Sequence, residues 1–183
     1  KYLAAATAAA SVLPTEMVRD DGRLLHSWRG GEAKFDAYLD DYAYFTNALI
    51  SLYEASFDER WIDEAVRLAD LVLSHFSDTD ADGFFFTAAD HEQLIARNKD
   101  VHDSSVPSSN AMAATALIRL GKLTGRNDYV EAARGALESV VTVMRDSPAA
   151  AGQSLIATDM LYEATKEIAI VGSDQQQVMA TAS

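Results

Sequence analysis

The sequence predicts an all-α fold, an array of αα-hairpins with small β-hairpins in its long loops. Three observations carry this prediction: a repeat along the chain, helical spacing of the apolar residues, and an alternation of nearly uncharged and amphipathic segments. The chain has 183 residues, of which 49% are hydrophobic, and this is enough for one sizeable core. We therefore expect one domain over residues 1–172 and a polar tail over 173–183.

A repeat with an offset of 68 residues (116 − 48 and 129 − 61) organises the middle of the chain. The segment ALISL at 48–52 returns as ALIRL at 116–120, and Trp61 returns as Tyr129. Each of the two aromatic residues follows a short turn and opens an amphipathic run. The repeating unit is therefore a pair of helices, and stacked pairs bury a continuous core.

The predicted helices are of two kinds. The run at 61–76 is amphipathic, because its apolar positions recur every three to four residues and its charges share the other face. The run at 42–53 carries no charge, as expected of a helix that is buried on most sides. We assign the first kind to an outer layer and the second to an inner layer. The outer helices are expected at 1–18, 59–77 and 127–145, and the inner helices at 40–55, 108–123 and 148–164.

Two connections from an outer to an inner helix are long. Residues 19–39 and 78–107 exceed the usual helix–helix loop of about 2–8 residues, and long loops on a rigid scaffold commonly carry function. The stretch DTDADG at 78–83 has the order of an EF-hand loop, but the twelfth position is Ala89 instead of an acidic residue. We expect a solvated turn that leads into a β-hairpin, with at most weak calcium binding.

Sequence signals also mark the two ends. The run at 1–13 is shorter than the roughly 18 apolar residues that a bilayer span needs, and no convincing cleavage site follows it. We expect no targeting segment and a cytoplasmic location. Ser147 and Pro148 are expected as the N-cap and first residue of the last inner helix, and residues 167–172 as a short strand.

Composition excludes several function classes. The formal net charge is -13 and the pI is about 4.5, so nucleic acid and anionic membrane surfaces are not expected as partners. The sequence has no cysteine, which excludes disulfides, thiolate metal sites and cysteine catalysis within it. No histidine pair has zinc-ligand spacing, and no phosphate or dinucleotide fingerprint is present. We therefore expect no metal and no cofactor.

A set of short motifs occurs in a specific order over nearly the whole chain. They are LDDYA at 39–43, LYEA at 52–55, DERW at 58–61, GFFFT at 83–87, KD at 99–100 with Asp103, and PSSN at 107–110. In this order they resemble the C-terminal part of the spermatogenesis-associated protein 20 family, whose members contain a thioredoxin domain. The resemblance implies about half of an (α/α)6 toroid, similar to six-hairpin glycosidases and sugar 2-epimerases. It also implies an N-terminal thioredoxin-like domain, missing from this chain, and a glycine where Ser109 stands.

In toroids of this kind the loops before the inner helices line a central cleft. Asp41 and Asp103 lie just before or at the start of two inner helices, so we name both as catalytic candidates. Two carboxylates act as acid and base on a glycosidic bond, or one removes a proton beside a carbonyl. His102 is a third candidate by its location, whereas His26, in the strand-like part of the first long loop, is assigned no role. The alternative for Asp41 is a helix cap.

Six further residues are candidates for substrate binding, because arginine forks and aromatic rings suit hydroxyl-rich or anionic molecules. Each has a structural alternative: capping at the helix start, core packing of the tyrosine, or solvated loop charges. The candidates are Arg29, Tyr42, Arg97, Lys99, Ser108 and Asn110.

Two functions stay open from the sequence. The chain binds or processes a carbohydrate, as a glycosidase or an epimerase would, in the cleft lined by the loops before the inner helices. Alternatively, it is a non-catalytic scaffold for the missing thioredoxin-like domain. A half-toroid exposes the apolar faces of its inner helices, so self-association through them is a further expected partnership.

Overall fold

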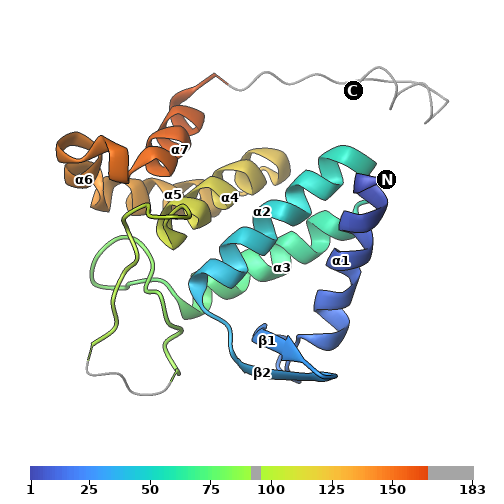
Figure 1. Cartoon of the computed structure of the whole chain (residues 1–183). Helices are drawn as coiled ribbons and strands as arrows, with labels where there is room; N and C mark the ends of the chain where they lie inside the picture. Colours follow the sequence, from blue (N-terminus) through green and yellow to red (C-terminus); the bar gives the residue numbers. More distant parts are fainter. Residues whose placement is uncertain (92–95, 165–183) are drawn as a thin grey trace.

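The structure is a computed structural model of the chain, described here for residues 1–91 and 96–164 (Figure 1). Over these ranges it is mostly helical, with one two-stranded sheet, which confirms the predicted all-α array of αα-hairpins. The elements are α1 (Tyr2–Glu16), β1 (Leu25–Arg29), β2 (Glu32–Asp36), α2 (Leu39–Ser56), α3 (Arg60–His75), α4 (Ser109–Thr124), α5 (Asn127–Ser139), α6 (Val141–Asp146), the 3-10 helix η1 (Pro148–Ala150) and α7 (Gly152–Tyr162). The expected strand at 167–172 and the tail lie outside the described residues.

The inner helices α2, α4 and α7 run parallel. Near the starts of α2 and α4 the Tyr44 hydroxyl donates to the Pro107 carbonyl at 3.0 Å, and near their ends Arg119 contacts the Glu54 carboxylate at 2.7 Å. Between α4 and α7, Gln153 in the first turn of α7 bonds to the Thr115 hydroxyl at 2.9 Å. The N-terminal ends of all three helices therefore gather at one rim, the arrangement expected for part of a toroid.

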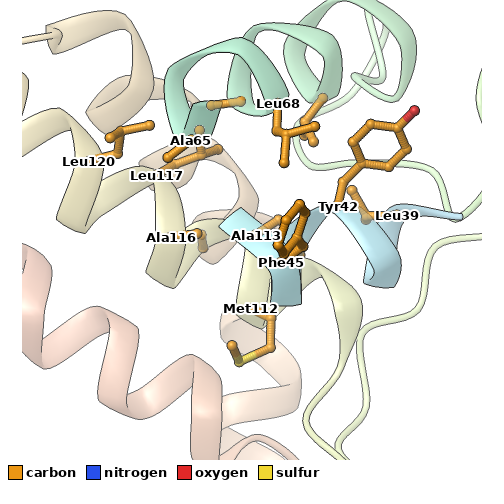
Figure 2. Packing of buried hydrophobic residues seen from close by; sticks show 14 of the residues in the cluster. Leu39, Tyr42, Phe45, Ala65, Leu68, Met112, Ala113, Ala116, Leu117 and Leu120 are labelled. Atoms are coloured by element: carbon orange, nitrogen blue, oxygen red, sulfur yellow. The ribbon is translucent and has the colours of Figure 1, made fainter. Parts of the chain in front are cut away.

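The outer helices cover this layer. Helix α3 packs along α2, and α5 packs along α4, while α1 makes a smaller contact with α2 (Figure 1). Leu68 of α3 and Leu117 of α4 are buried in one apolar cluster with side chains of α2 (Figure 2). Complete burial of a leucine contributes about 1.5–3 kcal/mol, so this cluster is the main source of stability. No helix in the described ranges is both long and apolar enough to span a bilayer.

The third hairpin differs from its prediction. The expected outer helix 127–145 breaks at Val140, whose φ of -110° and ψ of 10° end α5 before α6 begins. The β-branched run at 140–143 explains the break, because such side chains lose rotamer freedom in a helix. Pro148 opens the 3-10 helix η1 instead of α7, and Ser147 forms no side-chain cap bond.

The two long loops have different structures. In the first, β1 and β2 form an antiparallel hairpin in which Ser27 pairs with Lys34. Its turn consists of Gly30 and Gly31, whose φ values of 65° and 84° suit a two-residue hairpin. In the described part of the second loop the expected hairpin is reduced to a single bridge from Ser77 to Phe84.

Candidate functional site

A pocket of about 390 Å³ opens at the N-terminal end of α2, on the rim where the inner helices begin. Its polar lining residues are one histidine, two adjacent aspartates and one tyrosine, and its remaining walls are apolar side chains of α1, α2 and the first long loop. The lining residues are Leu13, Met17, Leu24, Leu25, His26, Asp40, Asp41, Tyr44 and Phe45.

His26 and Asp41 form a pair at this pocket. Asp41 lies in the first turn of α2, and its Oδ2 accepts a hydrogen bond from the Tyr38 backbone N–H at 2.9 Å. The same oxygen lies 2.8 Å from Nδ1 of His26, which β1 places opposite the start of α2. An ionised carboxylate only accepts hydrogen bonds, so this contact favours the tautomer with the proton on Nδ1 and a lone pair on Nε2. The N-cap of α2 is therefore Tyr38 and not Asp40 or Asp41; Asp41, at the third helical position, accepts from the N-cap backbone and is also a pocket residue.

Asp40 and Tyr44 complete the polar wall. Asp40 Oδ1 accepts from the Asp41 backbone N–H at 3.0 Å. Burial raises the pKa of Asp40, and the neighbouring negative charge of Asp41 raises that pKa further. The pKa of Tyr44 is raised by burial and then by the charges of Asp40, Asp103 and Asp100. The Tyr44 hydroxyl thus lies in a negative field to which the second long loop also contributes.

Asp103 holds two inner helices together at the same rim. Its Oδ1 accepts from the Ser108 backbone N–H and its Oδ2 from the Gln153 backbone N–H, both at 2.8 Å. Its own N–H donates to the Ala150 carbonyl at 2.8 Å. Asp103 therefore bridges the starts of α4 and α7, and it supplies for α7 the cap bond that Ser147 does not make.

The predicted binding residues at the start of α4 also have structural partners. Ser108 is the N-cap of α4, and its Oγ accepts from the Ala111 backbone N–H at 3.3 Å. The buried Asn110 side chain bonds to both the N–H and the C=O of Phe84 at 2.8 Å. Ser109 is buried with no hydrogen-bond partner for its hydroxyl among the described residues. Its φ is not positive, so the backbone does not require the glycine of the family pattern.

Arg97 and Lys99 contact other residues of the second loop and stabilise its conformation. The Arg97 guanidinium lies 4.0 Å from the centroid of the Phe85 ring and donates to the Thr87 carbonyl. Lys99 Nζ lies 2.8 Å from Asp78 Oδ2 and 2.7 Å from the Asp82 carbonyl. The hydrogen bond from Lys99 is the largest cause that lowers the pKa of Asp78.

The DTDADG turn therefore encloses the ammonium of Lys99. Asp78 Oδ1 also accepts from the backbone N–H groups of Asp80 and Ala81, at 3.0 and 3.1 Å, as in an Asx turn. Within 1–91 and 96–164 no group of three or more acidic or histidine side chains is arranged to hold a metal ion.

The remaining candidates lie apart from the pocket. Tyr42 is 2% exposed, its hydroxyl accepts from the Leu24 N–H at 2.9 Å, and its ring packs on Phe76. It is therefore a core residue, which is the structural alternative to substrate binding that we gave for it. Arg29 ends β1 and His102 lies on the second loop, and both are exposed outside the pocket lining.

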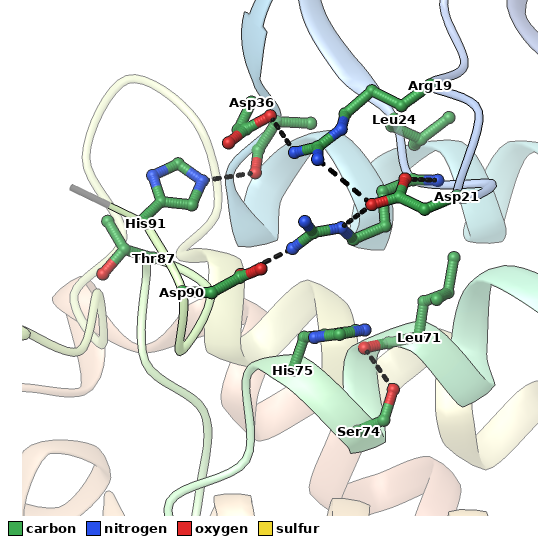
Figure 3. Close-up of polar contacts among 12 residues, drawn as sticks. Arg19, Asp21, Leu24, Asp36, Leu71, Ser74, His75, Thr87, Asp90 and His91 are labelled. Atoms are coloured by element: carbon green, nitrogen blue, oxygen red, sulfur yellow. Dashed lines mark hydrogen bonds and ion pairs between the residues drawn. The ribbon is translucent and has the colours of Figure 1, made fainter.

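Charged contacts connect the first loop to the second (Figure 3). The Arg23 guanidinium lies 3.0 Å from Asp21 Oδ2 and 2.5 Å from Asp90 Oδ1, and these carboxylates raise its pKa. His91 Nε2 lies 3.3 Å from the Ala37 carbonyl (Figure 3). The Arg23 pairs join the start of the first loop to the second loop, and the His91 contact reaches the segment between β2 and α2.

Sequence reasoning missed His26 and Asp40 as pocket residues. His26 is 15 residues from Asp41, and their contact depends on how the β1–β2 hairpin folds back on α2. The signal that was available is the position of His26 in a strand-like segment of a long loop, beside two glycines that permit a tight hairpin.

These features define a class: a helical-hairpin domain with an inner and an outer layer and a polar pocket where the inner helices begin. A solved structure with a partly similar fold is that of the endo-beta-1,4-glucanase CMCax from Acetobacter xylinum. It is similar to this chain with a TM-score of 0.48 and 18% sequence identity, over 78% of this chain and 40% of that one. No protein-family model matches the chain.

Sequence comparison finds curated proteins that are similar to this chain. Spermatogenesis-associated protein 20 of Rattus norvegicus is 34% identical over 139 residues, 75% of this chain and 18% of that protein. The protein of the same name from Homo sapiens is 33% identical over the same shares, and that of Mus musculus is 31% identical over 185 residues, 96% of this chain and 23% of that protein. The chain is therefore homologous to part of spermatogenesis-associated protein 20. It spans about a fifth of the length of these curated relatives.

Proposed function

We propose that this chain contributes a binding site for a carbohydrate or a similar hydroxyl-rich small molecule. The observation that carries the proposal is the pocket at the start of α2, which His26, Asp40, Asp41 and Tyr44 line together. Its volume of about 390 Å³ falls in the range of small-molecule sites, which combine apolar walls with a few polar groups. The homology and the helical scaffold support this location at the mouths of the inner helices.

The pocket chemistry selects the ligand charge. Carboxylate and imidazole groups accept hydrogen bonds from hydroxyl groups, and the described residues that line the pocket include no lysine or arginine. A neutral sugar or polyol fits this wall, whereas a sugar phosphate or a uronic acid meets like charge. In this proposal Asp40 and Asp41 are the carboxylates at the ligand. Asp103 positions the helix ends and does not contact the ligand, because backbone N–H groups already occupy both of its oxygens.

The test is calorimetric titration of the full-length protein with a panel of neutral mono- and disaccharides and their phosphorylated counterparts. We expect at least one neutral sugar to bind, and Asp40→Ala to weaken that binding about tenfold, which corresponds to about 1.4 kcal/mol. Asp63→Ala is the matched control, because Asp63 is an exposed carboxylate on the outer helix α3. Absence of sugar binding, or equal losses in the two variants, would contradict the proposal.

A second candidate is a non-catalytic scaffold for the thioredoxin-like domain of the longer protein. An apolar groove of about 580 Å³ between α1 and α2 favours it, because Tyr2 and Leu3 there are 86% and 43% exposed. Pull-down with the thioredoxin-like domain tests this candidate, and we expect Leu3→Glu to abolish capture if the groove is used. Sedimentation of the chain alone tests the proposed self-association; a monomer at all concentrations would contradict it.

A further inference from the structure

We propose that the groove between α1 and α2 is the contact surface of a symmetric dimer, in which the α1 helices of two copies of this chain pack antiparallel. The inference does not depend on the sugar proposal, because none of the polar pocket residues takes part. It assigns a face and a geometry to the self-association expected from the sequence. The same groove favours the second candidate function, so the experiment must separate these two occupants.

The groove has the shape of a helix and carries no charge. It is lined by about three turns of α1, from Tyr2 to Leu13, and by about three turns of α2, from Phe45 to Ala55. Its volume of about 580 Å³ therefore extends over a length of roughly 15 Å. None of the described residues that line it is charged. An elongated apolar space of this kind suits an uncharged helix.

Helix α1 has the composition of a buried helix but lies at the surface. It has no charged side chain from Tyr2 to Thr15, whereas the outer helices α3 and α5 each carry several. Most of its side chains are exposed, and Ala10 is the one residue of α1 that is buried. An uncharged helix that is exposed on most sides is expected to have a partner. Helix α1 is therefore suited to fill a groove as well as to form the wall of one.

Charge permits a second copy in the groove and selects its direction. Each copy has a formal net charge of -13, so two copies repel one another except where their surfaces are uncharged, as on this face. Lys1 precedes α1 and Glu16 ends it. Antiparallel packing brings Lys1 of each copy to the end of α1 where Glu16 of the other copy lies. Parallel packing would instead place like charges together.

The spacing of the side chains gives the register. Tyr2, Ala6, Ala9 and Leu13 line the groove at intervals of four, three and four residues, the spacing of a helix–helix seam. In an antiparallel pair, Tyr2 then lies opposite Leu13 of the second copy, and Ala6 lies opposite Ala9. The small alanines meet at the centre, where crossing helices come closest, and the large side chains fill the wider ends. The pattern is therefore complementary to itself.

The same direction matches the packing of the inner helices. Met17, just after α1, accepts from the Leu25 N–H, and the Leu24 N–H donates to the Tyr42 hydroxyl, so α1 ends near the start of α2. At its other end, α1 begins beside the end of α2 (Figure 1). A helix that lies antiparallel to α1 in the groove therefore runs in the direction of α2, as α4 does. Each α1 then packs against both α1 and α2 of the other copy.

The first experiment is sedimentation of the full chain over a range of concentrations. We expect the wild type to dimerise, and Ala6→Glu to weaken dimerisation at least about 100-fold, because the seam would then bury two carboxylates without partners. Ala8→Glu is the matched control, because Ala8 is exposed on the same helix but does not line the groove. We expect the control to change the dissociation constant of the dimer by less than about threefold.

Cysteine cross-linking tests the direction of the two helices. The sequence has no cysteine, so a single-cysteine variant can form a disulfide only between copies. We expect an equimolar mixture of Tyr2→Cys and Leu13→Cys to form a linked dimer under mild oxidation, and neither variant to do so alone. In the antiparallel register, identical positions lie roughly 16 Å apart along the helix, beyond the about 7 Å between Cα atoms that a disulfide spans.

A chain that stays monomeric at all concentrations contradicts the dimer. If the thioredoxin-like domain is then captured by the wild type and not by Leu3→Glu, the groove binds that domain instead. Equal dimerisation of Ala6→Glu and the wild type would place the interface elsewhere, and a linked dimer of Tyr2→Cys alone would mean a parallel pair. Sugar binding in the polar pocket is measured separately by calorimetry, so its failure and the failure of the dimer are distinguishable.

Discussion

The first and second long loops occupy equivalent places in the fold but use their polar side chains differently. Both connect an outer helix to an inner one, and both contain Asp-Gly near their start, at 21–22 and 82–83, with apolar residues shortly after. The first loop leaves His26 beside a pocket at the mouth of α2. In the second loop, Asp103 is occupied with the backbone N–H groups of Ser108 and Gln153, and the backbone of Phe84 is held by Asn110 of α4.

The difference follows from how each loop satisfies its backbone. The β1–β2 ladder pairs N–H and C=O groups of residues 25–36 with one another, so the paired groups need no side-chain partners. The described part of the second loop has only one isolated bridge outside its turns. Some peptide groups of that loop bond to backbone groups elsewhere, as Phe85 N–H does to the Phe76 carbonyl, whereas those of the buried Phe84 bond to the Asn110 side chain. The first loop, which forms its own sheet, thus places His26 at the pocket, whereas a side chain of α4 holds part of the backbone of the second loop.

Asn110→Ala is the most severe test of this comparison. Its side chain satisfies both backbone groups of the buried Phe84, and removing it leaves a donor and an acceptor unpaired. Each unsatisfied buried group costs about 1–3 kcal/mol, so we expect a loss of about 3 kcal/mol in the free energy of unfolding, measured by chemical denaturation. The exposed Asn127→Ala serves as the control, with an expected change below about 0.5 kcal/mol. Similar losses in both variants would show that Asn110 does not secure the loop.

Asp103→Ala comes next in expected size. The variant removes one cap bond from α4 and one from α7, and each is worth about 0.5–2 kcal/mol, so we expect a loss of about 2 kcal/mol. Hydrogen exchange should also speed up at the first turn of α7. If unfolding is unchanged while sugar turnover disappears, Asp103 is a catalytic residue at the ligand and its structural assignment is wrong.

Periodicity predicted much of the fold because it reflects burial. The apolar spacing after Trp61 located α3 to within a few residues, and the uncharged run after Tyr42 located α2. The break at Val140 was missed, because weak helix propensity in a β-branched run shows only when tertiary packing does not override it. The rim was predicted from the resemblance, since hairpin repeats alone do not reveal which helix ends meet.

The candidate site was less predictable because its contacts are long-range. The sequence placed Asp41 at a helix mouth, which local capping signals indicate. It did not reveal His26 as the partner of Asp41, since that contact depends on the fold of the hairpin. It also did not reveal that the ammonium of Lys99 pairs with Asp78 of the calcium-like turn, 21 residues earlier. Nothing in the local pattern specifies that the later part of the second loop packs against its start.

Asp40→Asn tests the pocket beside the first loop, because Asp40 lies in the first turn of α2 and lines that pocket. The folded pKa of Asp40 is raised, so folding favours its protonated form, and the ionised carboxylate lowers stability. Its stabilising contribution is complete below the ordinary value of 3.8 and is lost as pH rises through the folded pKa. At pH 7 we expect the free energy of unfolding of Asp40→Asn to be up to about 1 kcal/mol higher than that of the wild type. The difference should shrink as the pH falls below the folded pKa of Asp40. Asp63→Asn is the control. If Asp40→Asn is less stable than the wild type, Asp40 has a structural role, as Asp103 does in the second loop.

Lys99→Ser has the smallest expected effect and decides how the DTDADG turn works. The variant removes the ammonium from between the Asp78 carboxylate and the Asp82 carbonyl, which leaves oxygen ligands for a hard cation. We expect no calcium binding in the wild type and weak binding in the variant, with a Kd on the order of 1 mM, which at about 1 mM calcium stabilises the fold by about 0.4 kcal/mol. Lys99→Arg keeps the positive charge and should bind no calcium by calorimetry. Tight calcium binding by the wild type would mean that calcium displaces the ammonium, and the turn would then belong with the ligand-binding loops.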